Sequence, residues 1–226
     1  MKSGVIASVH GTGDLNDFYE TVEPQAEEFN QLEQCVQITE EISLSNGKVA
    51  RLGRAAIEDL SDVEDVRISD GVIRQYERPE KITLYTDFLF VPDSFVAIAS
   101  SSGTFAFDLI EQNASVSVEQ IEFDLEGYTE QNPDAGPWKV GFYDRIGNAE
   151  NGVMHGEQLL NDSEIGSVLG TSKKNQVGLE YNHDGHLLKT FVTRSGYVEV
   201  YQPSNYSSSD FVGFIESELL PHATPK

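Results

Sequence analysis

The residues best suited to chemistry in this sequence are two histidines on either side of an Asp-Gly pair. His183, Asp184 and His186 place two imidazoles and one carboxylate within four residues, and these groups bind Zn²⁺ or Mn²⁺. The spacing is short, and no third, remote ligand is evident from the sequence. The Asp-Gly pair is also typical of a β-hairpin turn. We therefore expect a turn here, with a divalent metal site and metal-assisted hydrolysis as the alternative.

The other nucleophiles lack the sequence context of a catalytic site. Cys35 is the only cysteine, which excludes an intramolecular disulfide, and no histidine lies near it in sequence. It is expected to be a small buried hydrophobic residue. The chain has no Gly-x-Ser-x-Gly elbow, and Gly11-Thr12-Gly13 lacks the further glycines and the lysine of a phosphate loop. We expect a protein that is not an enzyme and that needs no cofactor.

The charge of the chain predicts its solvent. The 226 residues include 38 acidic and 15 basic side chains, a net charge of −23, and the acids are spread along the whole sequence. At 1 M salt the screening length is only about 3 Å, so an evenly acidic surface no longer repels itself. The composition therefore predicts a protein from a halophile. It disfavours non-specific binding of nucleic acid, although a local basic or aromatic face could still bind it.

Hydropathy predicts a cytoplasmic protein with a well-developed core. Hydrophobic residues make up 38% of the chain, and no run of 18 apolar residues predicts a membrane span. The N-terminal residues have one lysine and too short an apolar run for a secretory signal. We expect a protein partner or self-association and no membrane contact.

The most apolar stretch, residues 82–110, is the expected centre of the fold. Apolar side chains occupy both parities of its first strand, with Leu84 and Phe88 on one face and Tyr85 and Leu89 on the other. A strand of this kind is covered on both faces. Pro92 then begins a turn, a second strand follows, and a serine-rich loop leads into a helix.

Further elements alternate along the rest of the chain. Asn-Gly at 46–47 and Asp-Gly at 70–71 predict hairpins. Helical patterns are expected within 14–34, at 54–66 and, by preference over a strand, within 113–132. A three-stranded meander over 176–202 and a helix from about residue 210 complete the chain. These elements indicate an α+β fold with a mainly antiparallel sheet and packed helices. We divide it into an N-terminal half (1–115), a helix and linker-like connection (116–137) and a C-terminal half (138–226).

The two halves share a pattern that predicts a pseudo-twofold duplication. In both, a strand, a tight turn, a second strand, a serine-rich loop and a helix follow one another, at 82–110 and at 186–215. The C-terminal copy, Phe191-Val-Thr-Arg-Ser-Gly-Tyr-Val-Glu-Val-Tyr201 followed by a helix, resembles the repeated unit of TATA-binding-protein-like folds. The resemblance implies a saddle-shaped sheet that bends DNA, but analogy of fold carries no function by itself.

Three functions are compatible with these patterns. The first is a non-enzymatic, cytosolic regulatory or interaction protein that binds a protein partner through a sheet face or through the C-terminal helix. The second is a DNA-associated regulator with the TATA-binding-like saddle. The third is a hydrolase with a metal at His183 and His186. A basic, concave sheet face would favour the second, and a cleft with converging histidines and carboxylates the third.

Overall fold

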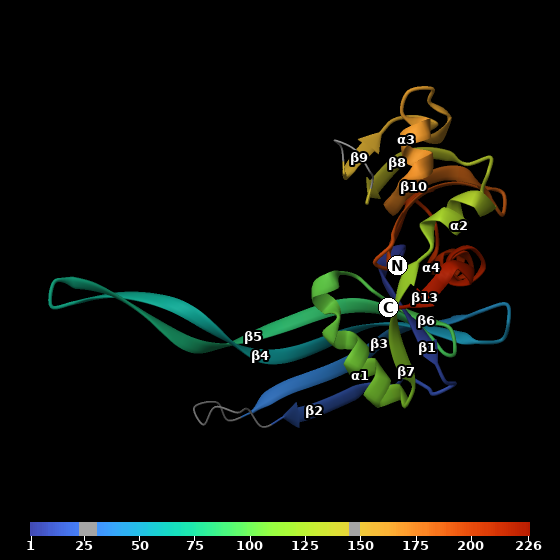
Figure 1. Cartoon of the computed structure of the whole chain (residues 1–226). Coiled ribbons are helices and arrows are strands. Elements are labelled where there is room, and N and C mark those ends of the chain that lie inside the picture. Colours follow the sequence, from blue (N-terminus) through green and yellow to red (C-terminus); the bar gives the residue numbers. More distant parts are fainter. Residues whose placement is uncertain (23–30, 145–149) are drawn as a thin grey trace.

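The computed structural model describes residues 1–22, 31–144 and 150–226. It consists of an antiparallel sheet, a few short helices and one long projecting hairpin (Figure 1). The described strands are β1 (Ser3–His10), β2 (Phe18–Val22), β3 (Leu32–Ser43), β4 (Val49–Ser69), β5 (Val72–Val91), β6 (Phe95–Ile98), β7 (Ser117–Phe123), β8 (Gly136–Tyr143), β9 (Gly152–His155), β10 (Lys173–His183), β11 (His186–Thr193), β12 (Tyr197–Gln202) and β13 (Ala223–Pro225). The α-helices are α1 (Phe105–Ala114), α2 (Leu125–Gln131), α3 (Gly166–Thr171) and α4 (Ser208–Phe214), which continues into a π-helical turn at Ile215–Leu219. Single 3₁₀ turns lie at Ser101–Gly103, Leu159–Asn161 and Leu220–His222.

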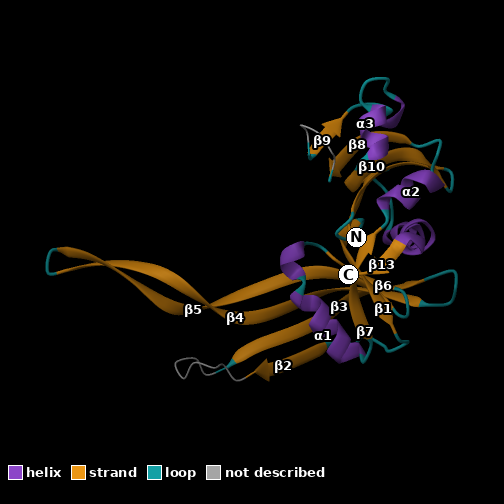
Figure 2. Ribbon diagram, in the orientation of Figure 1, coloured by secondary structure: helices purple, strands orange, loops and turns teal. Residues whose placement is uncertain are grey.

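Strand β1 joins the two parts of the sheet. The strand order is β2-β3-β4-β5-β6-β1-β12-β11-β10-β8-β9, and every pairing is antiparallel. One edge of β1 pairs with β6. Its other edge pairs first with β12 and then with β7, which in turn pairs with β13. The N-terminal and C-terminal strands are thus continuous through one central strand (Figure 2).

From Phe88 onward, the apolar stretch at the end of β5 and in β6 is covered on both faces, as the sequence predicts, whereas Leu84 and Tyr85 before it are 36% and 73% exposed and the prediction is wrong for them. Phe88 and Phe90, with Val96 and Ile98 beside them, pack in a cluster with α1. Leu89 and its neighbours on the opposite face pack in a second cluster with the C-terminal strands and α4. A strand with apolar residues at both parities is stable only where both faces are buried. The two clusters together therefore fix this segment at the centre of the molecule.

The predicted hairpins are confirmed. The Asn-Gly turn at 46–47 joins β3 to β4, and the Asp-Gly turn at 70–71 joins β4 to β5. Asp70 and Gly71 have φ of 53° and 77°, and a tight two-residue turn of the I′ type needs positive φ at both positions. The meander β10-β11-β12 is confirmed as well.

Two of the expected helices are wrong. Residues 54–66 belong to β4, where the polar residues alternate with residues such as Ala55, which is fully buried under α1. Pairing with β3 on one side and β5 on the other outweighs the weak helical preference of the alanines. In the stretch expected to be helical within 14–34, Phe18–Val22 is a strand and Leu32 begins another. The intervening residues 23–30 lie outside the described part of the chain.

The helical expectation within 113–132 is also corrected. Ser117–Phe123 is a strand, in which Ile121 and Phe123 face the core and Glu122 does not. Only Leu125–Gln131 is helical, and Asp124 caps it by accepting a hydrogen bond from the Gly127 N–H. Buried and exposed residues alternate along this segment, which pairs with β1 on one side and with β13 on the other. This alternation is that of a strand with one buried face. The sequence also predicts a turn over residues 145–152, of which 145–149 lie outside the described residues.

The same order of elements occurs twice. β5, β6, α1 and β7 follow one another in the first half, and β11, β12, α4 and β13 in the second. β6 and β12 lie on opposite edges of β1, and β7 pairs with β13. This order is compatible with a duplication. The duplication itself, and the division into halves at 1–115 and 138–226, stay predictions.

Helix α4 starts with a reciprocal cap whose removal is expected to cost stability. The Ser207 hydroxyl accepts from the Asp210 N–H, and the Asp210 carboxylate accepts from the Ser207 N–H. Ser207→Ala is expected to lower the free energy of unfolding by about 1 kcal/mol, measured as a shift of the denaturant midpoint. Ser209→Ala is the control, because within the described residues the Ser209 hydroxyl makes no hydrogen bond. Equal shifts in both variants would contradict the cap.

Candidate functional site: a projecting two-stranded arm

The feature that the core does not explain is the distal half of the β4–β5 hairpin. Strand β3 pairs with β4 only as far as Ile57, and β6 pairs with β5 only from Phe88. Beyond Ile57, β4 and β5 pair only with each other, from Glu58↔Thr83 to Ser69↔Val72. We call residues 58–83 the arm. At about 3.3 Å per residue it extends roughly 40 Å from the sheet, and it stands clear of the body in Figure 1.

The end of the arm exposes apolar side chains. Ile68 and Ile73 lie directly opposite each other and are 77% and 69% exposed. Val66, two residues before Ile68, lies on the same face and is exposed as well, and Val72 is exposed on the opposite face. We call residues 66–78 the tip. Three aliphatic side chains on one face of a thin ribbon form an apolar surface that no part of the described chain covers, and such surfaces mark contact sites.

Contacts along the arm hold the ribbon in register. The Tyr76 hydroxyl donates to Asp65 Oδ2 at 2.8 Å, and the Arg67 guanidinium lies 4.9 Å from the Tyr76 ring centroid. Nearer the body, Lys81 Nζ is 2.8 Å from Glu58 Oε1. Cross-strand pairs of this kind add a few tenths of a kcal/mol each. An isolated two-stranded hairpin in water is only marginally stable, so the arm gains most from a partner that covers it.

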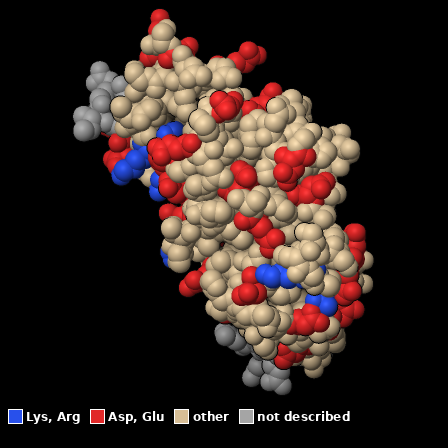
Figure 3. Space-filling view, turned by 90° about the vertical axis from the view of Figure 1, so that its right-hand side faces the viewer, with Lys and Arg blue, Asp and Glu red and all other residues tan. Residues whose placement is uncertain are grey.

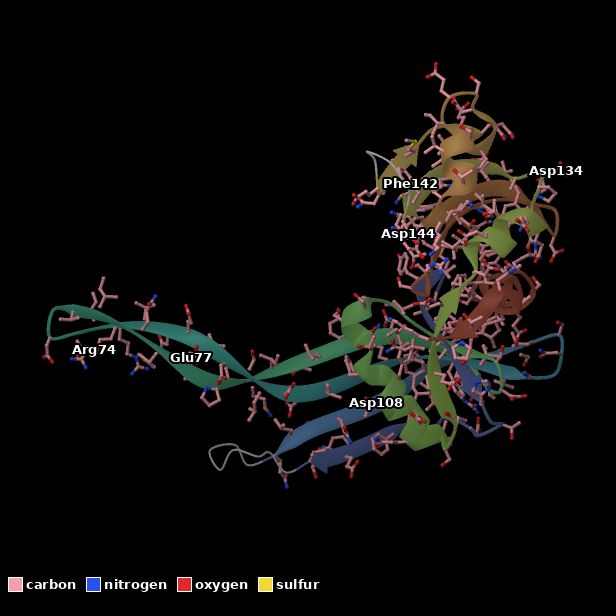
Figure 4. The ribbon with its side chains drawn as sticks, viewed as in Figure 1. Arg74, Glu77, Asp108, Asp134, Phe142 and Asp144 are labelled. Atoms are coloured by element: carbon pink, nitrogen blue, oxygen red, sulfur yellow. The ribbon has the colours of Figure 1, made fainter. Side chains whose placement is uncertain are left out.

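The tip also differs in charge from the rest of the molecule. Residues 66–78 hold three arginines and two acids, a net charge of +1. The whole chain carries −23, so the remainder carries −24. Figure 3, viewed from the side opposite to the arm, shows Asp and Glu spread over the body and Lys and Arg in a few small groups. Figure 4 shows Arg74 and Glu77 on the arm, far from Asp108 and Asp134 on the body.

Two cationic side chains of the tip oppose each other. Arg67 pairs in register with Arg74, and like charges directly opposite destabilise a ribbon. Arg67 lies 3.2 Å from Asp65 Oδ2, whereas Arg74 has no carboxylate within ion-pairing distance in the described part of the chain. An acidic surface of a partner would neutralise Arg74.

Sequence reasoning missed the arm although its signals are present. The Asp-Gly turn was recognised, but residues 54–66 were assigned to a helix, which hid the length of the hairpin. Val63, Val66, Ile68 and Val72 are β-branched residues of the kind that favours strands. The basic residues in this region mostly pair with neighbouring carboxylates, as Arg54 does with Asp87 and Lys81 with Glu58.

The histidines singled out in the sequence lie at the β10–β11 turn. Asp184 and Gly185 have φ of 47° and 80°, so the predicted turn is confirmed. His183 lies between Asp184, at 3.6 Å from its Nε2, and Glu218, at 3.5 Å from its Nδ1. His186 instead lies against the Tyr206 ring, at 6.3 Å between centroids.

A metal at this turn has limited structural support. In residues 1–22, 31–144 and 150–226, no group of three or more histidine, cysteine or carboxylate side chains is arranged to hold a metal ion. His183 and Glu218 are nearly buried and form a contact that stabilises the packing of α4 on the sheet. The metal site at His183, Asp184 and His186 stays a prediction.

A hollow in the C-terminal part is lined in part by Trp138. Its volume is about 600 Å³, and its lining includes His155, Glu180 and Lys189. Lys189 Nζ lies 4.8 Å from the indole centroid and 3.9 Å from Glu180. The chain's own cation therefore already occupies the exposed face of the indole.

The sheet face that a DNA saddle would use is neutralised internally. Lys173 Nζ is 2.6 Å from Asp144, and Arg194 is 3.3 Å from Glu126. Lys139 Nζ lies 4.0 Å from the centroid of Phe191, a residue of the TATA-binding-like stretch. DNA binding stays a prediction, and these pairs reduce the positive charge available to phosphates.

No protein-family model matches the chain, and no curated protein sequence matches it either. Within the described residues, no helix is both long and apolar enough to span a membrane. The projection of the arm beyond the sheet is the feature of the described chain that its own packing does not explain.

Proposed function

We propose that this is a non-enzymatic interaction protein of a halophile that joins protein subunits through its β4–β5 arm. The observation that carries the proposal is the exposed pair of isoleucines at the end of a ribbon that pairs with nothing else in the described chain. Burying a large aliphatic side chain gains about 1.5–3 kcal/mol. The three on one face of the tip would gain about 4.5–9 kcal/mol before the costs of association are subtracted.

Side chains, more than added backbone hydrogen bonds, are proposed to carry the contact. Pro79 lies in the arm opposite Asp62 and has no N–H, and proline within a sheet protects an edge against strand addition. Charged residues along the proximal arm act in the same way. The tip beyond Pro79 combines aliphatic side chains with arginines, a composition enriched at protein interfaces.

The C-terminal helix is the weaker candidate for this role. Its large apolar residues, Phe211, Phe214 and Ile215, are fully buried in the core. A helix that contributes its apolar face to its own core has none left for a partner. The arm, and not the C-terminal helix, is therefore the proposed contact surface.

Concentrated salt is proposed as the working solvent. The acidic body repels other copies of itself at low ionic strength, and salt removes this repulsion while strengthening apolar burial. In concentrated salt the apolar side chains of the arm can therefore hold a contact that electrostatic attraction between subunits would not hold. The same surplus of negative charge keeps the separate subunits soluble.

Polar substitution of the two tip isoleucines tests the proposal. Ile68→Thr with Ile73→Thr keeps β-branched side chains, and so the strand, but removes apolar area. Self-association of the pure protein in 2 M KCl, measured by sedimentation equilibrium, is expected to weaken at least about tenfold. Leu187→Thr is the matched control, since Leu187 is also exposed, at 51%, but lies at the β10–β11 turn. Equal effects in both proteins would refute the arm as the contact.

A further inference from the structure

The open face of the N-terminal sheet carries a cross-strand row of two small residues between two tyrosines, which we call the slot. Tyr19, Cys35, Ala56 and Tyr85 lie in one cross-strand row over β2, β3, β4 and β5. Paired residues of an antiparallel sheet point to the same face. The row therefore places two small residues between two tyrosines, which are 63% and 73% exposed.

The slot lies on the face opposite to α1. The neighbouring row, Phe18, Val36, Ala55 and Thr86, has the other parity, and Val36 and Ala55 are buried in the cluster that contains α1. The slot residues therefore point away from this helix. The exposure of both tyrosines shows that the C-terminal strands do not cover the row either.

The dimensions of the slot suit the tip of an arm. Three strand spacings of about 4.8 Å separate the two tyrosine positions, which gives roughly 14 Å between the walls. Ile68 and Ile73, directly opposite each other, have their Cβ atoms about 5 Å apart. The floor of Cys35 and Ala56 leaves depth for both aliphatic side chains between the aromatic walls.

Charge favours the same match. Glu33 and Glu58 lie at one end of the slot, where the Tyr19 hydroxyl donates to Glu33 at 3.1 Å and the Glu33 N–H donates to Glu58 at 2.9 Å. Within the described residues Glu33 has no basic partner at ion-pairing distance, and Arg74 of the tip has no acidic one. Lys81 already pairs with Glu58 at this end, so Glu33 is the carboxylate with which Arg74 of a second copy would pair.

A chain cannot fill its own slot. The tip lies about 12 residues further along the same two strands than Ala56 and Tyr85, so it is roughly 40 Å away in a straight ribbon. The contact must form between copies. Because each copy carries both surfaces, the contact is either exchanged reciprocally within a twofold dimer or repeated from copy to copy as a ring or a filament.

We infer that the arm tip of one copy seats in the slot of Tyr19, Cys35, Ala56 and Tyr85 on a second copy. This inference rests on the proposed function of the arm and names the surface that receives the tip of the arm. The partner is therefore a second molecule of this chain, held by two isoleucines between two tyrosines.

Site-specific disulfide formation tests the acceptor, because Cys35 is the only cysteine. Ile73→Cys is oxidised with copper phenanthroline in 2 M KCl, where a disulfide needs Cα atoms about 4.4–6.8 Å apart. Covalent dimers and higher multimers are expected on non-reducing gels, at least about tenfold more than with Ser209→Cys, the control at the start of α4. The double variant Ile73→Cys/Cys35→Ser is expected to lose them.

The outcomes distinguish failure of the proposed slot from failure of the proposed arm contact. Dimers that persist in Ile73→Cys/Cys35→Ser would show arm-to-arm pairing and overturn the slot. Association that depends on Ile68 and Ile73 but gives no Cys35 cross-link would also overturn it, leaving the arm as a contact to another surface. As a second readout, Tyr85→Ser is expected to weaken association about as much as the tip substitutions do. An unchanged association constant would overturn the slot.

Discussion

Removal of the arm is expected to abolish self-association and leave the body folded. In the shortened protein an Asn-Gly turn replaces residues 58–83 and joins Ile57 to Leu84, which are paired in register. The arm adds no residue to either buried cluster, so the thermal midpoint in 2 M KCl should change by only a few degrees. Light scattering should then give one chain per particle at all accessible concentrations, whereas the full-length protein should form larger species.

The shortened protein carries its own control. Circular dichroism and the fluorescence of Trp138, which packs on Gly178 outside the arm, report whether the body has kept its fold. A folded protein with undiminished association would contradict the role of the arm. An unfolded protein would show that the arm supports the sheet, in contradiction to its position outside the buried clusters.

Transfer to low salt is expected to unfold the protein. At 50 mM KCl the net charge of −23 is screened only over about 14 Å, against about 2 Å at 2 M. Mutual repulsion of the acids then opposes the compact state. The β-sheet signal in circular dichroism should disappear between 2 M and 50 mM KCl and return when salt is restored.

Removal of charge is the control for this transition. Glu130, Asp134 and Glu157 are exposed and have no basic partner in the described part of the chain. Glu130→Gln, Asp134→Asn and Glu157→Gln together lower the net charge to −20 and should move the midpoint to lower salt. Equal stability at 50 mM and 2 M KCl would contradict the halophilic assignment.

Local patterns predicted the parts of the fold that depend on short-range chemistry. The Asn-Gly and Asp-Gly turns and the meander β10-β11-β12 are fixed by neighbouring residues, and the structure shows all of them. The double coverage of β6 and of the end of β5 from Phe88 followed from apolar residues at both parities, although Tyr85 in the same predicted strand is exposed. Each of these features needs only one segment to be interpreted correctly.

The failures come from partners remote in sequence. The composition of residues 54–66 is compatible with a helix or a strand. This segment is a strand because it pairs with β3 and β5. Ser117–Phe123 is a strand because β1 and β13, one from each end of the chain, lie beside it. The slot could not be foreseen, since Tyr19, Cys35, Ala56 and Tyr85 come from four strands whose register only the folded sheet defines.

The molar mass of the full-length protein in 2 M KCl tests the arm most directly. One chain has a mass of 25.0 kDa. Sedimentation equilibrium over a hundredfold range of concentration should give a mass that rises above this value as concentration increases, and that falls back to it with Ile68→Thr/Ile73→Thr. A mass of one chain at every concentration, in the unaltered protein, would contradict the proposal that the arm joins subunits of this protein.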